Sequence, residues 1–507
     1  MEHNNRMEIQ RYISLCVGIL GLVFCGIING FNIYAVALKQ TFNYTQTELE
    51  YITVSGIAGL ELTSYLSGVV IDKYGPRSTC VIAAILSSSC FALEWMSTKF
   101  ISFFTSRSWL ICLIYFVGSA GCCFTYMASM STIALNFEGK HQGKVVGFAS
   151  AMFGGSPLIF ALIYQVFFVQ GHVTDEQNQN LGGFFIMLSI WAGCTGVLGA
   201  GFLKIVPPVE THIPLMCEGE HSKQNFDETN VTTNETAIDH DIEKGKCVTA
   251  SDDNITNAKD NTLNDKTPLF QKESENNSLT TCSDEEKNMT CFRMVKTFKF
   301  HLLLWVVIII KGIGLTSSAN ITTIAKSAHL EATSSALILI IPIADTLARS
   351  LGGIIPDFLK QRLPFISVSS VLVFASFLMM VAQMILIFFN QSFVALVCFS
   401  IMSSVSTGFI AVMTPITISE FFGMKEFSQK LGLLLTLNGL AAFLFAKVFG
   451  WIYENNSPRG SKDCFGEHCS RKTFIIMAIF ALLSTLFSSA LLKTRWKCYK
   501  NPKLNQR

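Results

Sequence analysis

The chain has 507 residues, of which 50% are hydrophobic and only 15% are charged, and its mean hydropathy is +0.43. This composition excludes an ordinary soluble enzyme and is typical of a protein that crosses a membrane many times. The formal net charge of +2 and the lack of a basic, aromatic-interleaved patch exclude nucleic acid as an expected partner.

Apolar runs of about 20 residues are long enough to span a bilayer as helices. Twelve such runs occur, at 12–38, 51–71, 78–97, 109–135, 145–168, 183–206, 302–323, 335–356, 364–389, 393–417, 430–453 and 473–492. The first run is too long for the core of a signal peptide, so we expect it to remain as a membrane helix. The fold class predicted is an all-α integral membrane protein of twelve helices.

A segment of different composition separates the sixth run from the seventh. Residues 207–291 contain 18 of the 36 acidic residues and few aromatic ones, so they cannot bury enough apolar surface to fold. We predict an N-terminal six-helix bundle at 1–206, a disordered acidic loop at 207–291, and a C-terminal six-helix bundle with a basic tail at 292–507.

Lysine and arginine in the short loops indicate the orientation. If the N-terminus is cytosolic, the inner segments and the C-terminal tail hold sixteen of these residues and the outer loops hold eight. We therefore predict that both termini and the acidic loop are cytosolic, and that this loop is available to a cytosolic partner.

The last outer loop carries Cys464 and Cys469. A disulfide is expected on the non-cytosolic side, with two free thiols as the alternative. The remaining cysteines lie mainly in apolar runs, and no Cys-x-x-Cys pair or histidine cluster has metal-ligand spacing. No metal and no cofactor is predicted.

One short motif occurs twice. Gly68-x-x-x-Asp72 ends an apolar run and opens a basic loop containing Lys73, Gly75 and Arg77, and the motif recurs 285 residues later as Gly353-x-x-x-Asp357. The glycine lets two helices approach closely, and the aspartate places a carboxylate at the membrane face. The constant offset indicates two duplicated halves.

The loop from Asp72 to Arg77 is similar to the signature between helices 2 and 3 of the major facilitator superfamily. Other segments resemble its nodulin-like branch, which is related to monocarboxylate transporters: Asn32-Ile33-Tyr34, Asn136-Phe137, Arg349-x-x-Gly352-Gly353 and Glu420-Phe421-Phe422-Gly423. The resemblance implies two pseudo-symmetric bundles that alternate access to a site between them. One departure is the lack of any lysine between Tyr12 and Leu38, where monocarboxylate carriers have a functional one.

The same resemblance implies a gate at the repeated motif. Asp72 would join helices of the N-terminal half in the outward-facing state and release them when the halves rock. Gly68, Lys73, Gly75 and Arg77 belong to this gate, and Asp357 would be a weaker counterpart of Asp72 in the second half.

Asp345 and Arg349 lie four residues apart in the eighth run, hence on one helix face. Ionisable groups inside a bilayer are costly and usually face a cavity or a partner. Resemblance to monocarboxylate transporters implies that Arg349 holds a substrate carboxylate while Asp345 exchanges a proton. The alternative is a structural ion pair that locks the helix.

Three further ionisable residues lie within predicted helices. Lys311 is about 15 Å from the start of the seventh helix and either attracts an anion or snorkels to the interface. Glu61 is either a proton-coupling or cation site or a protonated, hydrogen-bonded structural residue. Glu94 is expected near the outer end of the third helix, where it reaches water.

Polar side chains on the first and seventh helices are candidate substrate ligands, because these helices usually line the central cavity in the superfamily. They are Asn29, Asn32 and Asn320, with helix–helix hydrogen bonding as the alternative. Tyr126 and Asn438 are weaker candidates on the fourth and eleventh helices.

These observations predict a monomeric secondary active transporter that moves a small, monocarboxylate-like organic anion with a proton. The expected location is the plasma membrane, with a vacuolar or other endomembrane as the alternative. No Gly-x-x-x-x-Gly-Lys-Ser/Thr motif indicates ATP coupling, and no catalytic constellation indicates an enzyme. Open alternatives are an amino acid or metal (iron) complex as substrate, and a non-transporting sensor or scaffold.

Overall fold

The structure is a computed structural model. It describes residues 2–139, 141–169, 179–206, 289–330, 334–362, 368–456, 464–466 and 468–500. The predicted acidic loop lies outside the described residues except for its last three positions. Helices make up the described chain almost entirely, apart from one isolated bridge between Val169 and Gln179.

The first half of the chain forms nine helical elements. They are α1 (Glu2–Cys25), the 3-10 helix η1 (Gly26–Ile33), α2 (Ala35–Phe42), α3 (Gln46–Leu62), α4 (Ser64–Ser97), α5 (Ile101–Thr105), α6 (Ser108–Asn136), α7 (Gln142–Phe167) and α8 (Leu181–Phe202). The second half contains α10 (Cys291–Val295), α11 (Phe298–Ala319), α12 (Ile321–Ser327), α13 (Ser334–Arg362), α14 (Ser370–Phe389), α15 (Phe393–Phe422), α16 (Phe427–Asn456) and α17 (His468–Lys500).

Eleven stretches of the described chain are long and apolar enough to cross a membrane. The longest, Thr47–Ser97, has 51 residues and would extend about 77 Å if straight, more than twice the bilayer core of about 30 Å. It turns back at Gly75, whose φ of +81° is accessible to glycine but strained for other residues, and Pro76 follows. The stretch therefore supplies two crossings, and the predicted twelve helices are confirmed.

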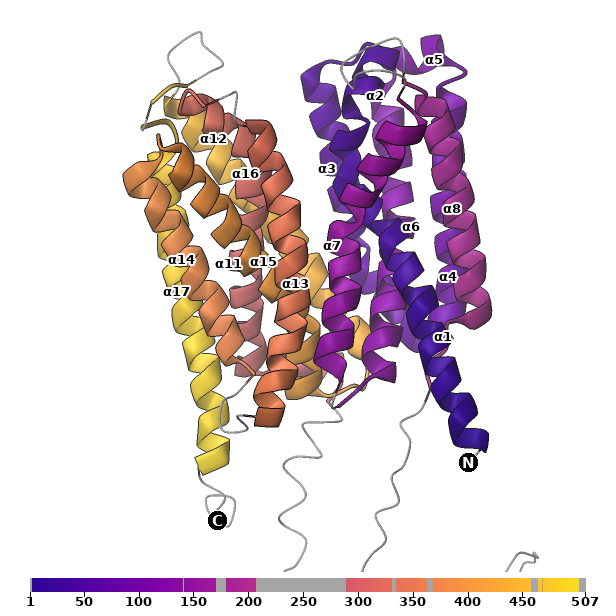
Figure 1. Cartoon of the computed structure of the whole chain (residues 1–507), viewed down its shortest axis with the longest axis vertical. Coiled ribbons are helices and arrows are strands. Elements are labelled where there is room, and N and C mark those ends of the chain that lie inside the picture. The colour runs from indigo at the N-terminus through magenta and orange to yellow at the C-terminus, as the bar shows by residue number, and fades with distance from the viewer. Residues whose placement is uncertain are drawn as a thin grey trace, which may run out of the picture. The chain divides into compact units, whose positions relative to one another are not determined.

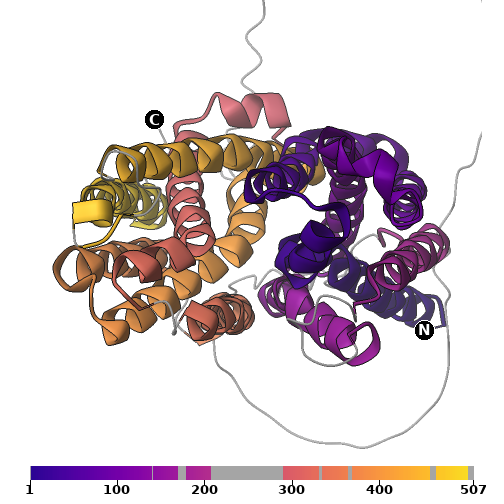
Figure 2. The same cartoon turned by 90° about the horizontal axis from the view of Figure 1, so that it is seen from above.

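The helices form two bundles. In the first, α4 packs against α6 and α8, and α1 packs against α6, α7 and α8. In the second, α13 packs on α15, α14 packs on α15 and α17, and α11 packs on α15, α16 and α17. Figures 1 and 2 show the helices of each bundle running side by side, with the first turn of α1 and the end of α17 at the same end.

Aromatic side chains fill much of the first bundle's interior, where Tyr34, Phe184 and Phe185 are buried with their rings in contact. Large apolar side chains such as Phe167 and Val197 instead remain exposed on the outside. A surface of this kind is covered by lipid acyl chains, so the membrane itself completes the packing.

The two bundles meet along two interfaces, α7 on α13 and α3–α4 on α16. These interfaces are related by the 285-residue offset, because α7 begins at Gln142 and α16 begins at Phe427. To within one residue, the offset also relates two interruptions, which lie at Tyr34 before α2 and at Asn320 before α12. The duplication therefore extends from sequence motifs to the geometry of the contact between the halves.

Candidate functional site

Small residues let α7 and α13 approach closely. A Cβ atom on Gly147 would come within 2.6 Å of the Gly353 Cα, and one on Gly154 would come within 2.7 Å of the Arg349 Nε. Only glycine fits at these two α7 positions without displacing α13. The interface therefore brings the Arg349 side chain directly against the other half.

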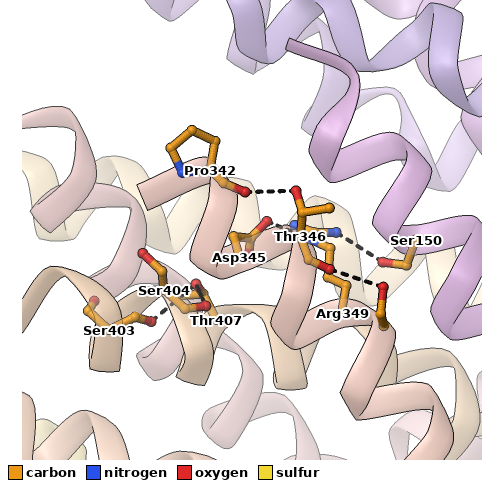
Figure 3. Close-up of polar contacts among 9 residues, drawn as sticks. Ser150, Pro342, Asp345, Thr346, Arg349, Ser403, Ser404 and Thr407 are labelled. Carbon is orange, nitrogen blue, oxygen red and sulfur yellow. Dashed lines mark hydrogen bonds and ion pairs between the residues drawn. The ribbon is translucent and has the colours of Figure 1, made fainter. Parts of the chain in front are cut away.

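Asp345 and Arg349 form an ion pair on α13. The Arg349 Nε donates to the Asp345 Oδ2 at 2.6 Å, and the two side chains are only 11% and 17% exposed, respectively. The Arg349 Nη1 also donates to the Ser150 Oγ of α7 at 3.0 Å (Figure 3). Because Ser150 belongs to the first bundle, the guanidinium joins the two halves as well as one helix turn.

Two aromatic rings extend this site into the first bundle. The Arg349 Cζ lies 6.0 Å from the centroid of the Phe153 ring, and that ring lies 4.8 Å from the ring of Tyr126. Tyr126 is half-buried and interacts electrostatically with Arg349. Phe153 therefore lies beside both the Arg349 guanidinium and the Tyr126 ring.

The second interface carries an acidic group in the corresponding place. A Cβ atom on Gly439 of α16 would come within 2.3 Å of the Glu61 Cβ, so glycine here makes room for the glutamate. The Glu61 side chain is half-buried and interacts with Asn438 and Lys311, while its Oε2 is buried without a hydrogen-bond partner. Gly154 and Gly439 are 285 residues apart, so Glu61 and Arg349 occupy pseudo-symmetric interfaces.

Lys311 interacts with charged residues of both sites. It sits on α11, is half-buried, and interacts electrostatically with Arg349, Asp345 and Glu61. Electrostatic interactions therefore link four ionisable side chains from three membrane helices. Ionisable groups within a bilayer are costly, so such a group is typical of a functional site.

The three asparagines lie elsewhere. Asn29 and Asn32 are exposed on η1, which is a 3-10 helix broken at Gly30 rather than the regular helix expected. Asn320 follows α11, and its Nδ2 donates to the Thr316 carbonyl of that helix at 2.8 Å. No contact recorded for the described residues joins these asparagines to the ion pair.

Both motif aspartates lie where a helix of the opposite half begins. The buried Asp357 accepts from the backbone N–H of Gly143 at 3.1 Å and of Lys144 at 2.8 Å, and Asp72 accepts from the N–H of Gln429 at 3.0 Å. N–H groups in the first turn of a helix have no partner within it and carry its positive dipole end. We call the end of the molecule that bears Asp72 and Asp357 the gate end.

The contacts of the residues predicted to form a gate differ from the sequence prediction in two respects. Asp72 bonds to α16 of the second half rather than to helices of its own half. Asp357, expected to be the weaker partner, is the buried one and has two bonds, whereas Asp72 is exposed and has one. Lys73 and Arg77 are exposed, and Gly68 packs its Cα against the Ser428 carbonyl.

Neighbouring residues stabilise the loop that follows α15. The buried Lys430 Nζ donates to the carbonyls of Phe422 at 2.6 Å and Gly423 at 3.1 Å, which satisfies the end of α15. The Cys291 N–H of α10 donates to Glu426 at 2.8 Å, and burial raises the pKa of the Cys291 thiol to about 11. The thiol is therefore neutral at physiological pH.

At the opposite end, Cys464 in the loop after α16 forms a disulfide with Cys469 in the first turn of α17. The Gly466 N–H inside this loop donates to the Ser327 carbonyl at the end of α12. His468 lies close enough that its nitrogen and the two sulfurs fall within 4.8 Å of one another. Cysteine binds a metal as the thiolate, and the disulfide leaves neither Cys464 nor Cys469 in that form.

Glu94 is not near water, contrary to expectation. Its side chain is only 4% exposed, its Oε2 has no hydrogen-bond partner, and it interacts with Tyr34 and Tyr115, whose hydroxyls are 3.4 Å apart. The third helix runs on to Ser97, and the short α5 follows it. Glu94 therefore lies inside the first bundle.

Sequence reasoning did not identify Ser150, Phe153 or Thr436, which contact the candidate residues across the interfaces. The 285-residue offset held a usable signal, because it pairs Gly147 with Gly432 and Gly154 with Gly439. Those pairs mark positions where the halves approach closely, and the missed residues are interleaved with them.

Comparison with known proteins agrees with this architecture. The model of the Major Facilitator Superfamily matches residues 17–385, and a model described as the NFD4 C-terminal domain matches residues 286–500. Similar curated proteins include a "Probable transporter mch1" of Emericella nidulans, 21% identical over 92% of this chain and 83% of the relative. Another of that name, from Neurospora crassa, is 24% identical over 92% of this chain and 86% of the relative.

The fold is also that of solved transporters. The proton:xylose symporter XylE superposes with a TM-score of 0.60 at 12% identity, covering 95% of each chain. The predicted fold and superfamily are confirmed, and the members of this superfamily are membrane transporters rather than enzymes. The chain belongs to the Major Facilitator Superfamily.

Proposed function

We propose that this transporter moves a small, monocarboxylate-like organic anion together with a proton. The observation that supports the proposal most directly is the Asp345–Arg349 pair, held on α13 against Ser150 of the other half. Guanidinium is the side chain best suited to bind a carboxylate, through two parallel hydrogen bonds.

Charge balance explains why a proton would accompany the anion. The ion pair is neutral without substrate. If Asp345 takes up a proton, Arg349 loses its counter-ion and a substrate carboxylate can replace it, so the site is neutral again. The halves can rock around a neutral occupied site at lower electrostatic cost than around a charged one, because the centre of the protein has a low dielectric constant.

Lys311 and Glu61 would complete this site. The ammonium of Lys311 attracts an anion toward Arg349, and Glu61 offers a second group that can hold the proton. Tyr126 and Phe153 present aromatic surface to the apolar part of the substrate. Asn29, Asn32 and Asn320 are proposed to contribute substrate contacts in states in which the halves are arranged differently.

The gate contacts suggest which state the structure represents. We propose that the gate end faces the cytosol, that both termini lie there, and that Asp72 and Asp357 hold it closed in an outward-facing state. Release of these contacts as the halves rock would open the site inward. We further propose a monomer in the plasma membrane, with an endomembrane as the alternative, and a cytosolic partner for the 207–291 loop.

The test is uptake by purified protein in liposomes of labelled monocarboxylates, amino acids and iron chelates, with and without an inward acid gradient. Gradient-stimulated monocarboxylate uptake is expected, and Arg349→Ala is expected to lower it by about tenfold to a hundredfold, because a charge-assisted bond contributes about 1.5–3 kcal/mol. Arg362→Ala, which removes an exposed charge from the same helix, is the matched control and should change little.

Other outcomes would overturn the proposal in distinct ways. Uptake of an amino acid or iron chelate that is indifferent to Arg349 would make the ion pair a structural lock. If folded protein transports nothing in the panel, the result favours the sensor or scaffold alternative. In that case deletion of the 207–291 loop should abolish signalling to, or binding of, the cytosolic partner.

A further inference from the structure

The second membrane helix is interrupted beside Glu61. The first part, α3, ends at Leu62, and the second part, α4, begins at Ser64. The backbone N–H of Thr63, which lies between them, donates to the Glu61 carbonyl in a tight turn. Two hydroxyls of the same segment donate hydrogen bonds to backbone carbonyls one turn earlier. The Thr63 Oγ1 donates to the Gly59 carbonyl at 2.7 Å, and the Ser64 Oγ donates to the Leu60 carbonyl at 3.0 Å. Hydroxyls that bond back in this way bend helices.

The third hydroxyl at this interruption comes from the other half of the protein. The Thr436 Oγ1 of α16 donates to the Glu61 carbonyl at 3.0 Å and accepts from the Tyr65 N–H at 3.1 Å. In an uninterrupted helix the Tyr65 N–H would bond the Glu61 carbonyl directly, since they are four residues apart. One threonine has therefore inserted into a backbone hydrogen bond of the opposite bundle, a recognised cause of helix kinks.

The pseudo-symmetric interface has no such insertion. Thr436 corresponds by the 285-residue offset to Ala151, which has no hydroxyl, and Glu61 and Tyr65 correspond to Thr346 and Ser350. There α13 runs continuously from Ser334 to Arg362, and the Thr346 hydroxyl bonds its own helix at Pro342 (Figure 3). The insertion is therefore particular to the helix that carries Glu61.

We propose that Thr436 is a positioning residue that couples the position of Glu61 to closure of the gate end. While the halves are joined, Thr436 prevents the Tyr65 N–H from bonding to the Glu61 carbonyl. It thereby keeps Glu61 next to Gly439, where Glu61 interacts with Asn438 and Lys311. When α16 moves away, Glu61 and Tyr65 pair with each other, the helix becomes regular, and the carboxyl is reoriented. This inference rests on the proposed alternating-access function but not on the identity of the substrate.

Native amides provide a direct readout of gate closure. The N–H groups of Gly143 and Lys144 are bonded to Asp357 across the other interface, so their hydrogen exchange reports the fraction of molecules with the gate open. They belong to α7, whereas Thr436 contacts α3 and α4. A purely local disturbance at Thr436 would leave them unchanged.

The experiment is hydrogen–deuterium exchange of full-length protein in lipid nanodiscs, read in peptides that contain the start of α7. Thr436→Val, which keeps the shape and removes the hydroxyl, is expected to speed exchange at these amides about tenfold. Thr436→Ser should restore the native rate. The matched control is Thr414→Val, which removes a buried hydroxyl bonded only within its own helix.

A second readout tests action through Glu61. In a Glu61→Gln background, Thr436→Val should have a smaller effect than in the native chain, because the group being positioned is already altered. Equal exchange for Thr436→Val and Thr414→Val would overturn the proposal, as would full additivity with Glu61→Gln. Hydrogen exchange needs no substrate. If Thr436→Val speeds exchange as expected but the uptake assay shows no monocarboxylate transport, only the proposed substrate is rejected.

Discussion

Arg349 is a single residue that contacts both halves of the transporter. Its Nε bonds to Asp345 on its own helix, and its Nη1 bonds to Ser150 on the opposite bundle. The four-residue spacing on a helix made the first contact predictable from the sequence. The second contact depends on Gly154 lying opposite, and that requires knowing how the two bundles meet.

The two motif aspartates make a testable pair at the residue scale. Asp357→Ala removes a buried acceptor and leaves two N–H groups without partners, so we expect the free energy of unfolding to fall by about 2 kcal/mol. Asp72→Ala removes one exposed contact and should cost less than about 1 kcal/mol. Thermal unfolding followed by tryptophan fluorescence measures both, with Lys73→Ala as the exposed control.

The order of these effects is the informative result. A larger loss for Asp72→Ala would mean that the exposed carboxylate dominates the gate, which contradicts the structure. Sequence motifs alone favoured that reverse order, because the signature residues surround Asp72. Burial and hydrogen bonding, which decide the energetics, depend on the opposing helix.

At the scale of helices, the close approach of α16 to α3–α4 depends on glycine. A Cβ on Gly432 would come within 2.3 Å of the Ser64 carbonyl oxygen, whereas one on Gly450 of the same helix would meet nothing within 4 Å. Gly432→Ala is therefore expected to separate the halves at the gate end and raise its open population at least tenfold. Gly450→Ala is the matched control.

Exchange at Gln429 gives the measurement, because its N–H is bonded to Asp72 only across this interface. Faster exchange is expected in Gly432→Ala and the native rate in Gly450→Ala. Native exchange in Gly432→Ala would show that α16 and α4 are not held together by this contact.

The helices themselves were predictable from the sequence, because an apolar run of about 20 residues satisfies its backbone hydrogen bonds in a bilayer by forming a helix. The interruptions of the helices were harder to predict. The break beside Glu61 depends on a hydroxyl from Thr436, which lies 375 residues away in sequence. The burial of Glu94 likewise depends on the packing of α4 against α6 and α8 rather than on its depth along one helix.

For the whole molecule, the orientation in the membrane is a testable prediction. Short tags on the N- and C-termini should be detected only after permeabilisation, because the basic inner loops favour a cytosolic position. Lys472→Cys, at an exposed position near the Cys464–Cys469 disulfide at the opposite end, should react with an impermeant maleimide in intact cells more than the native chain does. Tags stained in intact cells would invert the topology and place the gate end outside.

The measurement that tests the central claim most directly is simultaneous recording of proton and carboxylate entry into liposomes that contain the native protein or Asp345→Asn. We predict that the native protein takes up the two in equal amounts, because a proton on Asp345 and a carboxylate on Arg349 together leave the site neutral. Asp345→Asn should lose the net proton-coupled uptake. Carboxylate entry without protons, or unchanged proton entry in Asp345→Asn, would contradict the account.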